Sequence, residues 1–386
     1  MLSRCTRGPK TDWNLSNHTF VSRGHDSRFR SQTQLHTSAQ GGLKMPSWGE
    51  LLNELKQLQD KKQTEPFDYV RRKYLAELHA HTGRDTVLCA TRWTQPSTGI
   101  PPEFVSITEE DVHGLMEAFH GLSSDKLDLI LHSPGGSLEA TEAVVSYIRS
   151  KYSDVRVIIP HAAMSAATML ACSADKIVMG KHSFLGPIDP QMILDTPLGP
   201  QSIPAQAILD QFDRAKQECK DADLLSAWVP MLGQYGPALL TQCQEALDLS
   251  KELTSEWLAG YMFRGDQNAK EKAKMGASKL ANHKAFKTHG RHINREKARS
   301  FELSIENLEA DQRLEDLVLS VFYATNHTFN GTTATKIIEN HVGHAFVKMI
   351  KIRTAVPRPP QQPQVPPGQP PQTQPAPVPS GHQSLT

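Results

Sequence analysis

The stretch that decides the fold runs from Leu127 to Gln191. It begins LDLILHSPGGSLEATEAVVSYIRSKY and continues SDVRVIIPHAAMSAATMLACSADKIVMGKHSFLGPIDPQ. The apolar runs LDLILH and VRVIIP are typical of strands buried on both faces of a parallel sheet. Each run is followed by a turn and a helical pattern. This alternation predicts a layered α/β domain built around a parallel sheet.

The first turn, Ser133-Pro134-Gly135-Gly136, joins the first strand to a helix that Ser137 is expected to cap. Its two glycines permit a positive φ and let another backbone or a ligand approach closely. Backbone N–H groups exposed at such a turn suit an anion or an oxyanion. A tight turn that binds no ligand would show the same pattern.

The second turn carries Ser165 among small residues and leads into the apolar helix AATMLACSAD. At a helix N-terminus the serine hydroxyl lies where the helix dipole stabilises an alkoxide. Ser165 could instead be only a helix cap. No GxSxG motif, the sequence mark of a nucleophile elbow, is present.

Considered together, the two turns make a stronger prediction. Successive strand–helix units of one parallel sheet bring their turns to the carboxyl edge of the strands, where ligands bind. The amides of Gly136 and Ala166 could then stabilise an oxyanion beside the Ser165 hydroxyl.

The segments SPGGS and AAMSAATMLACSADKIVMGKHSFLGPIDPQ resemble the Clp protease/crotonase superfamily. More narrowly, they are similar to the signal peptide peptidase A group and its soluble relatives, the serine dehydrogenase proteinases, for which MPSWGELL and RRKYLAEL are also typical. The resemblance covers roughly residues 46–350. It implies repeated ββα units, a helical C-terminal part and a serine-type endopeptidase. It also implies that Ser165 is the nucleophile and that Gly135, Gly136 and Ala166 frame the oxyanion hole.

The general base is less clear. Clp proteases place a histidine where this chain has Ile188 or Asp189, whereas signal peptide peptidases use a lysine about 40 to 55 residues after the serine. The second pattern implies Lys216. It shares a helix face with Ile208, Leu209 and Phe212, where desolvation would lower the pKa of its amine. A surface lysine with a buried stem fits the same position.

Two further residues near the motif have open roles. Asp189 is either a polar group that lines the site or a turn residue between Pro187 and Pro190. His161 precedes the second turn and is a candidate base. Because alternate strand residues face opposite sides, we expect its side chain to point away from the site.

Two other functions remain alternatives to a serine peptidase. One is a crotonase-like acyl-thioester enzyme, in which the oxyanion hole stabilises an enolate and a carboxylate such as Asp189 handles protons. The other is a non-catalytic oligomeric scaffold that keeps the fold. A homo-oligomer is expected from the resemblance alone.

Composition narrows the partners. The 42 Lys and Arg against 41 Asp and Glu give a net charge of +1, so nothing suggests a nucleic-acid partner. Five widely spaced cysteines suggest free thiols in a reducing compartment. No HExxH or Cys/His cluster predicts a metal, and no cofactor is expected. No apolar run of 18 residues occurs, so a membrane contact would be peripheral.

The chain divides into three parts. Residues 1–44 are predicted to be disordered, as an extended start or an organelle transit peptide. Residues 45–350 are the expected peptidase domain, mainly helical after Pro187 and with a last helix over Thr333–Asn340. Residues 351–386 are a Pro- and Gln-rich tail that cannot build a core. A cytoplasmic location is expected, with a membrane surface or an organelle as the alternatives.

Overall fold

The computed structural model describes residues 47–95, 99–196 and 199–350. The expectations of disorder or targeting for residues 1–44, and of a tail for residues 351–386, lie outside the described residues. The described part belongs to one compact unit that ends at Ile350. None of its helices combines the length and the apolar character that a membrane span requires.

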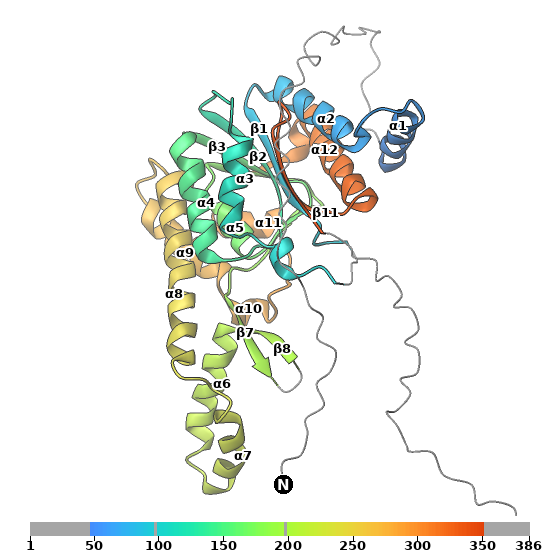
Figure 1. The fold of residues 1–386 in the computed structure, drawn as a ribbon. Coiled ribbons are helices and arrows are strands. Elements are labelled where there is room, and N and C mark those ends of the chain that lie inside the picture. Colours follow the sequence, from blue (N-terminus) through green and yellow to red (C-terminus); the bar gives the residue numbers. More distant parts are fainter. Residues whose placement is uncertain (1–46, 96–98, 197–198, 351–386) are drawn as a thin grey trace, which may run out of the picture. The chain divides into compact units, whose positions relative to one another are not determined.

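A seven-stranded sheet forms the centre, in the order β10-β5-β3-β2-β1-β11-β12 (Figure 1). The five strands from β10 to β1 are parallel to their neighbours, and β11 and β12 continue the sheet in antiparallel pairs. The strands are β1 Asp85–Thr91, β2 Lys126–His132, β3 Asp154–Ile159, β5 Lys176–Met179, β10 Ile305–Asn307, β11 Ala334–Asn340 and β12 Ala345–Met349. The predicted α/β architecture with a parallel sheet is confirmed.

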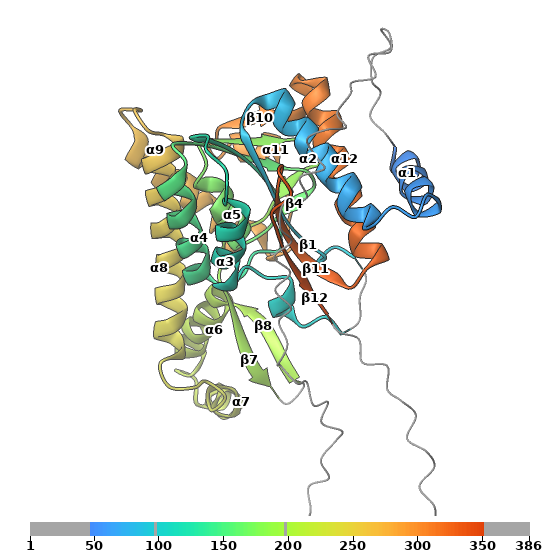
Figure 2. The ribbon, with the colours of Figure 1, turned by 45° about the horizontal axis from the view of Figure 1, so that its top comes forward.

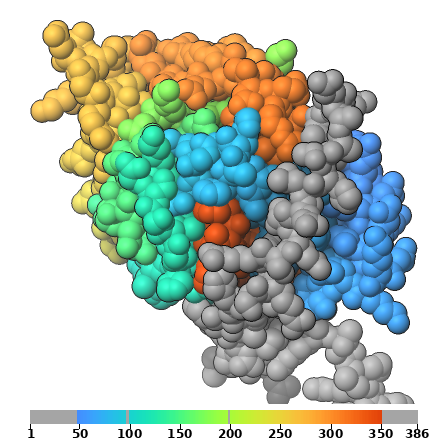
Figure 3. All heavy atoms as spheres, turned by 90° about the horizontal axis from the view of Figure 1, so that it is seen from above, coloured from blue at the N-terminus to red at the C-terminus, as the bar shows by residue number. Residues whose placement is uncertain are grey.

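Helices cover both faces of this sheet (Figures 1 and 2). They are α1 Trp48–Asp60, α2 Pro66–Thr82, α3 Glu110–Ala118, α4 Leu138–Lys151, α5 Ala166–Cys172, α6 Ala205–Glu218, α7 Ala222–Leu232, α8 Leu239–Trp257, α9 Ala269–Leu280, α10 His283–Phe286, α11 Arg295–Arg299 and α12 Gln312–Gly331. Figure 3, from above, shows how segments from both halves of the sequence share one surface.

The alternation of side chains along the strands separates two cores. On β2, Leu127, Leu129 and Leu131 point into the core shared with α4, α8 and α9. Ile130 points to the other face, into the core shared with α1, α2 and α12. Both sets are essentially excluded from solvent, as expected for a strand that is covered on two sides.

The helix predicted over Thr333–Asn340 is wrong, because Ala334–Asn340 is strand β11. β11 pairs antiparallel with β1, so that Val87 faces Asn340. Two charged residues of the strand are buried with partners. The Lys336 amine bonds Asp111, and Glu339 bonds Arg71 of α2. The sequence pattern alone does not predict this strand, because its charged residues find their partners in distant segments of the chain.

Beyond Pro190 the chain leaves the sheet and forms a separate arm. A hairpin of β7 (Gln191–Thr196) and β8 (Gly199–Pro204) leads into α6 and α7, and the chain returns through α8. The arm has its own small core, which includes Ile208, Leu239 and Leu247. Figures 1 and 2 both show α7 at the end of this arm, well away from the sheet.

Candidate active site

Ser165 lies on a strained turn between the short strand β4 (Ala162–Ala163) and α5. Its φ of 52° and ψ of −125° form a conformation that L-residues rarely adopt and that costs about 1–3 kcal/mol. In α/β-hydrolases, a strained strand-to-helix turn exposes a serine hydroxyl in a similar way, there with the sequence GxSxG. The side chain is half-buried and makes no capping hydrogen bond to α5. Helix capping is therefore not what the hydroxyl does.

The two turns are in direct contact, as expected for the carboxyl edge of the sheet. The Ser133 amide donates to the Ala162 carbonyl at 3.2 Å, and the Met164 amide donates to the Ser133 carbonyl at 3.0 Å. Gly135 has a φ of +98°, and a Cβ on it would lie 2.6 Å from the Met164 carbonyl oxygen. Only glycine at this position lets the two backbones approach so closely.

The amide of Gly136 is directed away from its neighbouring strand. Ile107 bonds the residues on either side, donating to the Gly135 carbonyl at 2.7 Å and accepting from the Ser137 amide at 3.1 Å. In a parallel bridge of this pattern the N–H of the middle residue points to the opposite side. Over the residues that the structure describes, neither this amide nor that of Ala166 has a hydrogen-bond partner.

The site therefore combines a hydroxyl on a strained turn with two free amides beside it. The nitrogen of Ala166 would lie 2.8 Å from a Cβ on Gly135, which places the Ala166 amide against the first turn. The amide of Gly135 itself donates to the Ser133 hydroxyl at 3.2 Å. Ser137 caps α4 by accepting from the Ala140 amide at 3.1 Å, as predicted. Such a pair of preorganised donors can stabilise an oxyanion.

Lys216 lies elsewhere, near the end of α6 that leads into α7. Its side chain is 56% exposed and its amine pairs with Asp213 at 2.6 Å. The amine lies 5.4 Å from the centroid of the Phe212 ring, but its exposure means that it is not desolvated as expected. The apolar residues of its helix, such as Ile208, pack into the core of the arm instead.

Asp189 is buried, with 1% of its side chain exposed, and three side chains donate to it. The Nδ1 atoms of His289 and His283 lie 2.8 Å and 3.0 Å from its two oxygens, and the Gln191 amide nitrogen lies 3.1 Å from one of them. Sequence reasoning missed both histidines. No local signal would have found them, because they follow Asp189 by about a hundred residues.

His161 lies among aromatic rings. Its ring centroid is 5.5 Å from that of His132, 5.2 Å from that of Phe184 and 5.9 Å from that of Phe322. Burial is the main reason that its pKa lies below the ordinary imidazole value. The helix α12 carries Phe322. The His161 ring therefore packs against α12 and β6 (Phe184–Leu185).

His132, at the end of β2, is fully buried and its pKa is lowered to about 3, chiefly because burial disfavours the charged imidazolium. Its Nδ1 bonds the Ala162 carbonyl at 3.1 Å. The unfolded chain, with a pKa near 6.5, binds more protons between about pH 6.5 and pH 3. The stability contributed by neutral His132 is thus present above pH 6.5 and is lost as the pH falls through this window.

Lowering the pH from 7 to 5 is therefore expected to destabilise the wild-type protein by about 2 kcal/mol more than a His132→Asn variant. Asparagine keeps a donor for the Ala162 carbonyl but does not titrate. Denaturant unfolding of both proteins at the two pH values measures the difference. Equal losses of stability in the two proteins would contradict this origin of the acid sensitivity.

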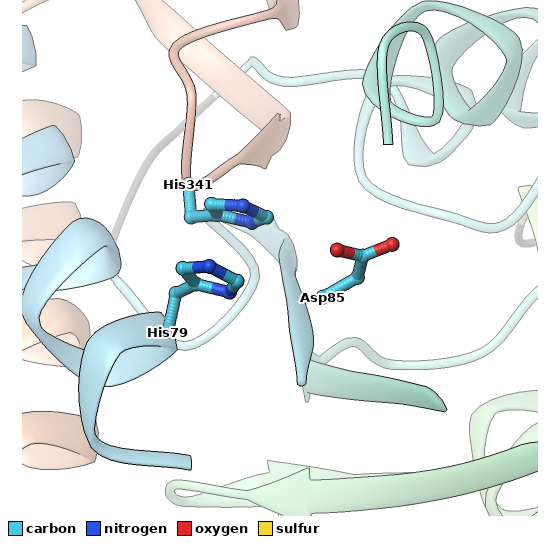
Figure 4. A group of neighbouring side chains, drawn as sticks. All are labelled: His79, Asp85 and His341. Atoms are coloured by element: carbon cyan, nitrogen blue, oxygen red, sulfur yellow. The ribbon is translucent and has the colours of Figure 1, made fainter. Parts of the chain in front are cut away.

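A second group of titratable residues lies at the opposite, amino edge of the sheet (Figure 4). Ligand atoms of His79, Asp85 and His341 lie within 4.8 Å of one another, the spacing of a potential metal site. The two imidazoles are stacked, with centroids 3.7 Å apart and planes 8° from parallel. Since each nitrogen lone pair lies in the plane of its ring, stacked rings cannot both aim at one ion. Joint coordination would require one ring to turn.

The chain was compared with known proteins. Two uncharacterized proteins of Methanocaldococcus jannaschii are similar to it. MJ0137 is 37% identical over 125 residues, 32% of this chain and 43% of that protein. MJ1495 is 31% identical over 174 residues, 45% of this chain and 52% of that protein. The chain thus spans about half the length of these curated relatives.

A solved structure, a mutant of the 1510-N membrane-bound stomatin-specific protease, matches with 14% identity and a TM-score of 0.31. The match covers 52% of this chain and 74% of that one. The family of ClpP-like SDH-type serine proteinases matches residues 58–319, which is well over half of the chain and includes both turns. The chain therefore belongs to the family of ClpP-like SDH-type serine proteinases.

Proposed function

We propose that this protein is a serine endopeptidase in which Ser165 attacks the carbonyl carbon of a peptide bond. The amides of Gly136 and Ala166 stabilise the oxyanion of the tetrahedral intermediate. The observation that carries this proposal is the meeting of a strained, uncapped serine with two unpartnered amides at one sheet edge. Membership of a serine proteinase family supports the same reaction class.

The strained backbone of Ser165 has a chemical consequence. The turn holds the hydroxyl outside the helix hydrogen-bond network, so that the oxygen is available for attack. The glycine turn is locked to it by the Ser133–Ala162 and Ser133–Met164 hydrogen bonds. Preorganised donors of this kind are worth about 2.7–4 kcal/mol each in the transition state.

The lysine base that the resemblance implied gains no support from the monomer, because the Lys216 amine is exposed and paired with Asp213. From the resemblance we further propose that the substrates are peptides, that the protein forms a homo-oligomer and that it contacts membranes peripherally. The relatives at 31% and 37% identity are uncharacterized and supply no substrate.

Covalent labelling with a fluorophosphonate probe tests the proposed nucleophile. We expect one adduct per chain, located on Ser165 by peptide mass spectrometry, and no adduct in the Ser165→Ala variant. A well-folded protein that does not label would point to the non-catalytic scaffold. Hydrolysis of acyl-CoA substrates that survives the loss of Ser165 would point to the acyl-thioester enzyme.

A further inference from the structure

The buried carboxylate of Asp189 and its two histidines have no part in the mechanism so far. The Gln191 amide and the Nδ1 atoms of both imidazoles converge on the two oxygens, and carboxylate oxygens accept hydrogen bonds. Each imidazole must therefore carry a proton on Nδ1. In the neutral ring this leaves a lone pair on Nε2, the atom that can accept a proton.

The Nε2 atoms of both histidines are available. Within the described ranges, neither atom has a hydrogen-bond partner. The side chain of His289 is 26% exposed and that of His283 is 14% exposed, whereas Asp189 is 1% exposed. A buried carboxylate that orients a partly exposed imidazole is the arrangement that serves a serine nucleophile in hydrolases.

The three-stranded sheet β4-β6-β9 places this group relative to Ser165. The central strand β6 (Phe184–Leu185) pairs parallel with β4, so that Ala163 faces Leu185. It pairs antiparallel with β9 (Ile293–Asn294), so that Leu185 faces Ile293. Ser165 follows β4, Asp189 follows β6, and His289 precedes β9. All three segments therefore leave the sheet at the same end.

Ser165 lies two residues beyond Ala163, and Asp189 lies four residues beyond Leu185, the partner of Ala163 in β6. Both therefore follow the paired strand ends within a few residues. Regular pairing ends before them, because the Ile188 amide donates to the Leu280 carbonyl at 3.1 Å. On the other side of β6, His289 precedes Ile293 by four residues, and its Nδ1 lies 2.8 Å from Asp189.

Direct contacts hold β6 and the Ser165 turn together beyond the paired residues. The Gly186 amide donates to the Ala163 carbonyl at 3.1 Å. A Cβ on Gly186 would lie 3.2 Å from the Cα of Met164, the residue before Ser165. Thr168 of α5 adds a hydrogen bond to the Gly186 carbonyl at 2.9 Å. The turn of Ser165 and the segment that leads to Asp189 are thus fixed to each other.

We propose that His289, oriented by the buried carboxylate of Asp189, is the general base of Ser165. His283 is a positioning residue, because it holds the second oxygen of Asp189. The inference rests on the proposed function, since it names the proton acceptor of the same reaction. The proposed base is thus an imidazole from the segment that precedes β9, in place of the exposed amine of Lys216.

The proton follows the bonds that form and break. As Ser165 Oγ bonds to the carbonyl carbon, its proton passes to His289 Nε2. The imidazolium returns this proton to the departing amine nitrogen when the C–N bond breaks, leaving an acyl-serine. A water molecule then gives one proton to Nε2 while its oxygen attacks the ester. Collapse of that intermediate returns the proton to Ser165 and releases the new carboxyl group.

Peptide hydrolysis and the rate of fluorophosphonate labelling, each measured from pH 5 to 9, test the assignment. His289→Gln is expected to lower kcat by about 10²–10⁴-fold, the usual contribution of a general base. We expect the labelling rate of wild type to rise with pH, and this rise should be absent in His289→Gln. His283→Gln, which leaves the carboxylate in place, should lower kcat by about 10-fold to 100-fold at most.

A matched control comes from the other end of the chain. His344 is also a partly exposed imidazole held by a carboxylate, with its Nδ1 3.1 Å from Glu117. His344→Gln should keep wild-type activity. A His289→Ala variant should regain activity in free imidazole, which a purely structural role of His289 would not produce. Far-UV circular dichroism checks that each variant folds.

The possible failures are distinguishable. If Ser165 labels and Ser165→Ala abolishes hydrolysis while His289→Gln retains wild-type activity and pH profile, only the base assignment is overturned. Loss of activity in Lys216→Met with full activity in His289→Gln would restore the lysine. If the probe does not label Ser165 in the wild-type protein and Ser165→Ala hydrolyses peptides at the wild-type rate, the proposed function itself is wrong.

Discussion

Ser165→Ala is expected to lower kcat for peptide hydrolysis by at least about 10⁴-fold, because the variant has no oxygen to attack the carbonyl. The remaining rate would come from the free amides of Gly136 and Ala166, which still polarise a bound carbonyl. KM should change little, since the Cβ and the backbone remain. Steady-state hydrolysis of a fluorogenic peptide library measures the loss.

Stability separates this effect from damage to the fold. Alanine at residue 165 keeps the unfavourable φ of 52°, so the free energy of unfolding should stay within about 1 kcal/mol of wild type. Ser165→Gly removes that strain and should be equally inactive but more stable by about 1 kcal/mol. An alanine variant that still cleaves at the wild-type rate would show that Ser165 is not the nucleophile.

Gly136→Ala is expected to reduce kcat by about 10²–10³-fold and to destabilise the protein by about 2–4 kcal/mol. A Cβ at this position would lie 2.2 Å from the carbonyl oxygen and 2.4 Å from the nitrogen of Ile107. Both are backbone atoms, so the backbone around Ile107 must move. That movement breaks the hydrogen bonds of Ile107 to Gly135 and Ser137, and it displaces the proposed oxyanion donor.

Gly236→Ala is the matched control, because a Cβ on Gly236 would meet no atom within 4 Å. Its activity should equal that of wild type and its stability should change by less than about 0.5 kcal/mol. Thermal unfolding and peptide hydrolysis of both variants test the contrast. Normal activity and stability in Gly136→Ala would show that this glycine is replaceable and that its amide is not an essential donor.

Several parts of the fold could be predicted from local patterns. The apolar run of β2 and the capping serine Ser137 each determine their own local structure, since two-sided burial and a helix cap are short-range requirements. The parallel sheet followed from the repetition of strand and helix. Because the sheet is parallel, Ser165 and Gly135 were expected to meet at its carboxyl edge, and they do.

Other parts depend on partners far away in the chain. The helix predicted over Thr333–Asn340 is instead the strand Ala334–Asn340, because β1 and β12 pair with it on either side. Its buried Lys336 is tolerated because Asp111 and the Ser106 carbonyl accept hydrogen bonds from its amine. Similarly, the resemblance to signal peptide peptidases implied Lys216 as the base, whereas the arm leaves that amine in solvent.

By itself, the sequence determined which residues form the two turns and that they lie at one edge of a parallel sheet. This is because hydrophobic periodicity and glycine conformation act over a few residues. Only the tertiary structure decided that Asp189 receives His289 from a hundred residues away, since that pairing depends on the register of β6 with β9. Local patterns single out the proposed nucleophile, and long-range strand pairing selects the imidazole that we propose as its base.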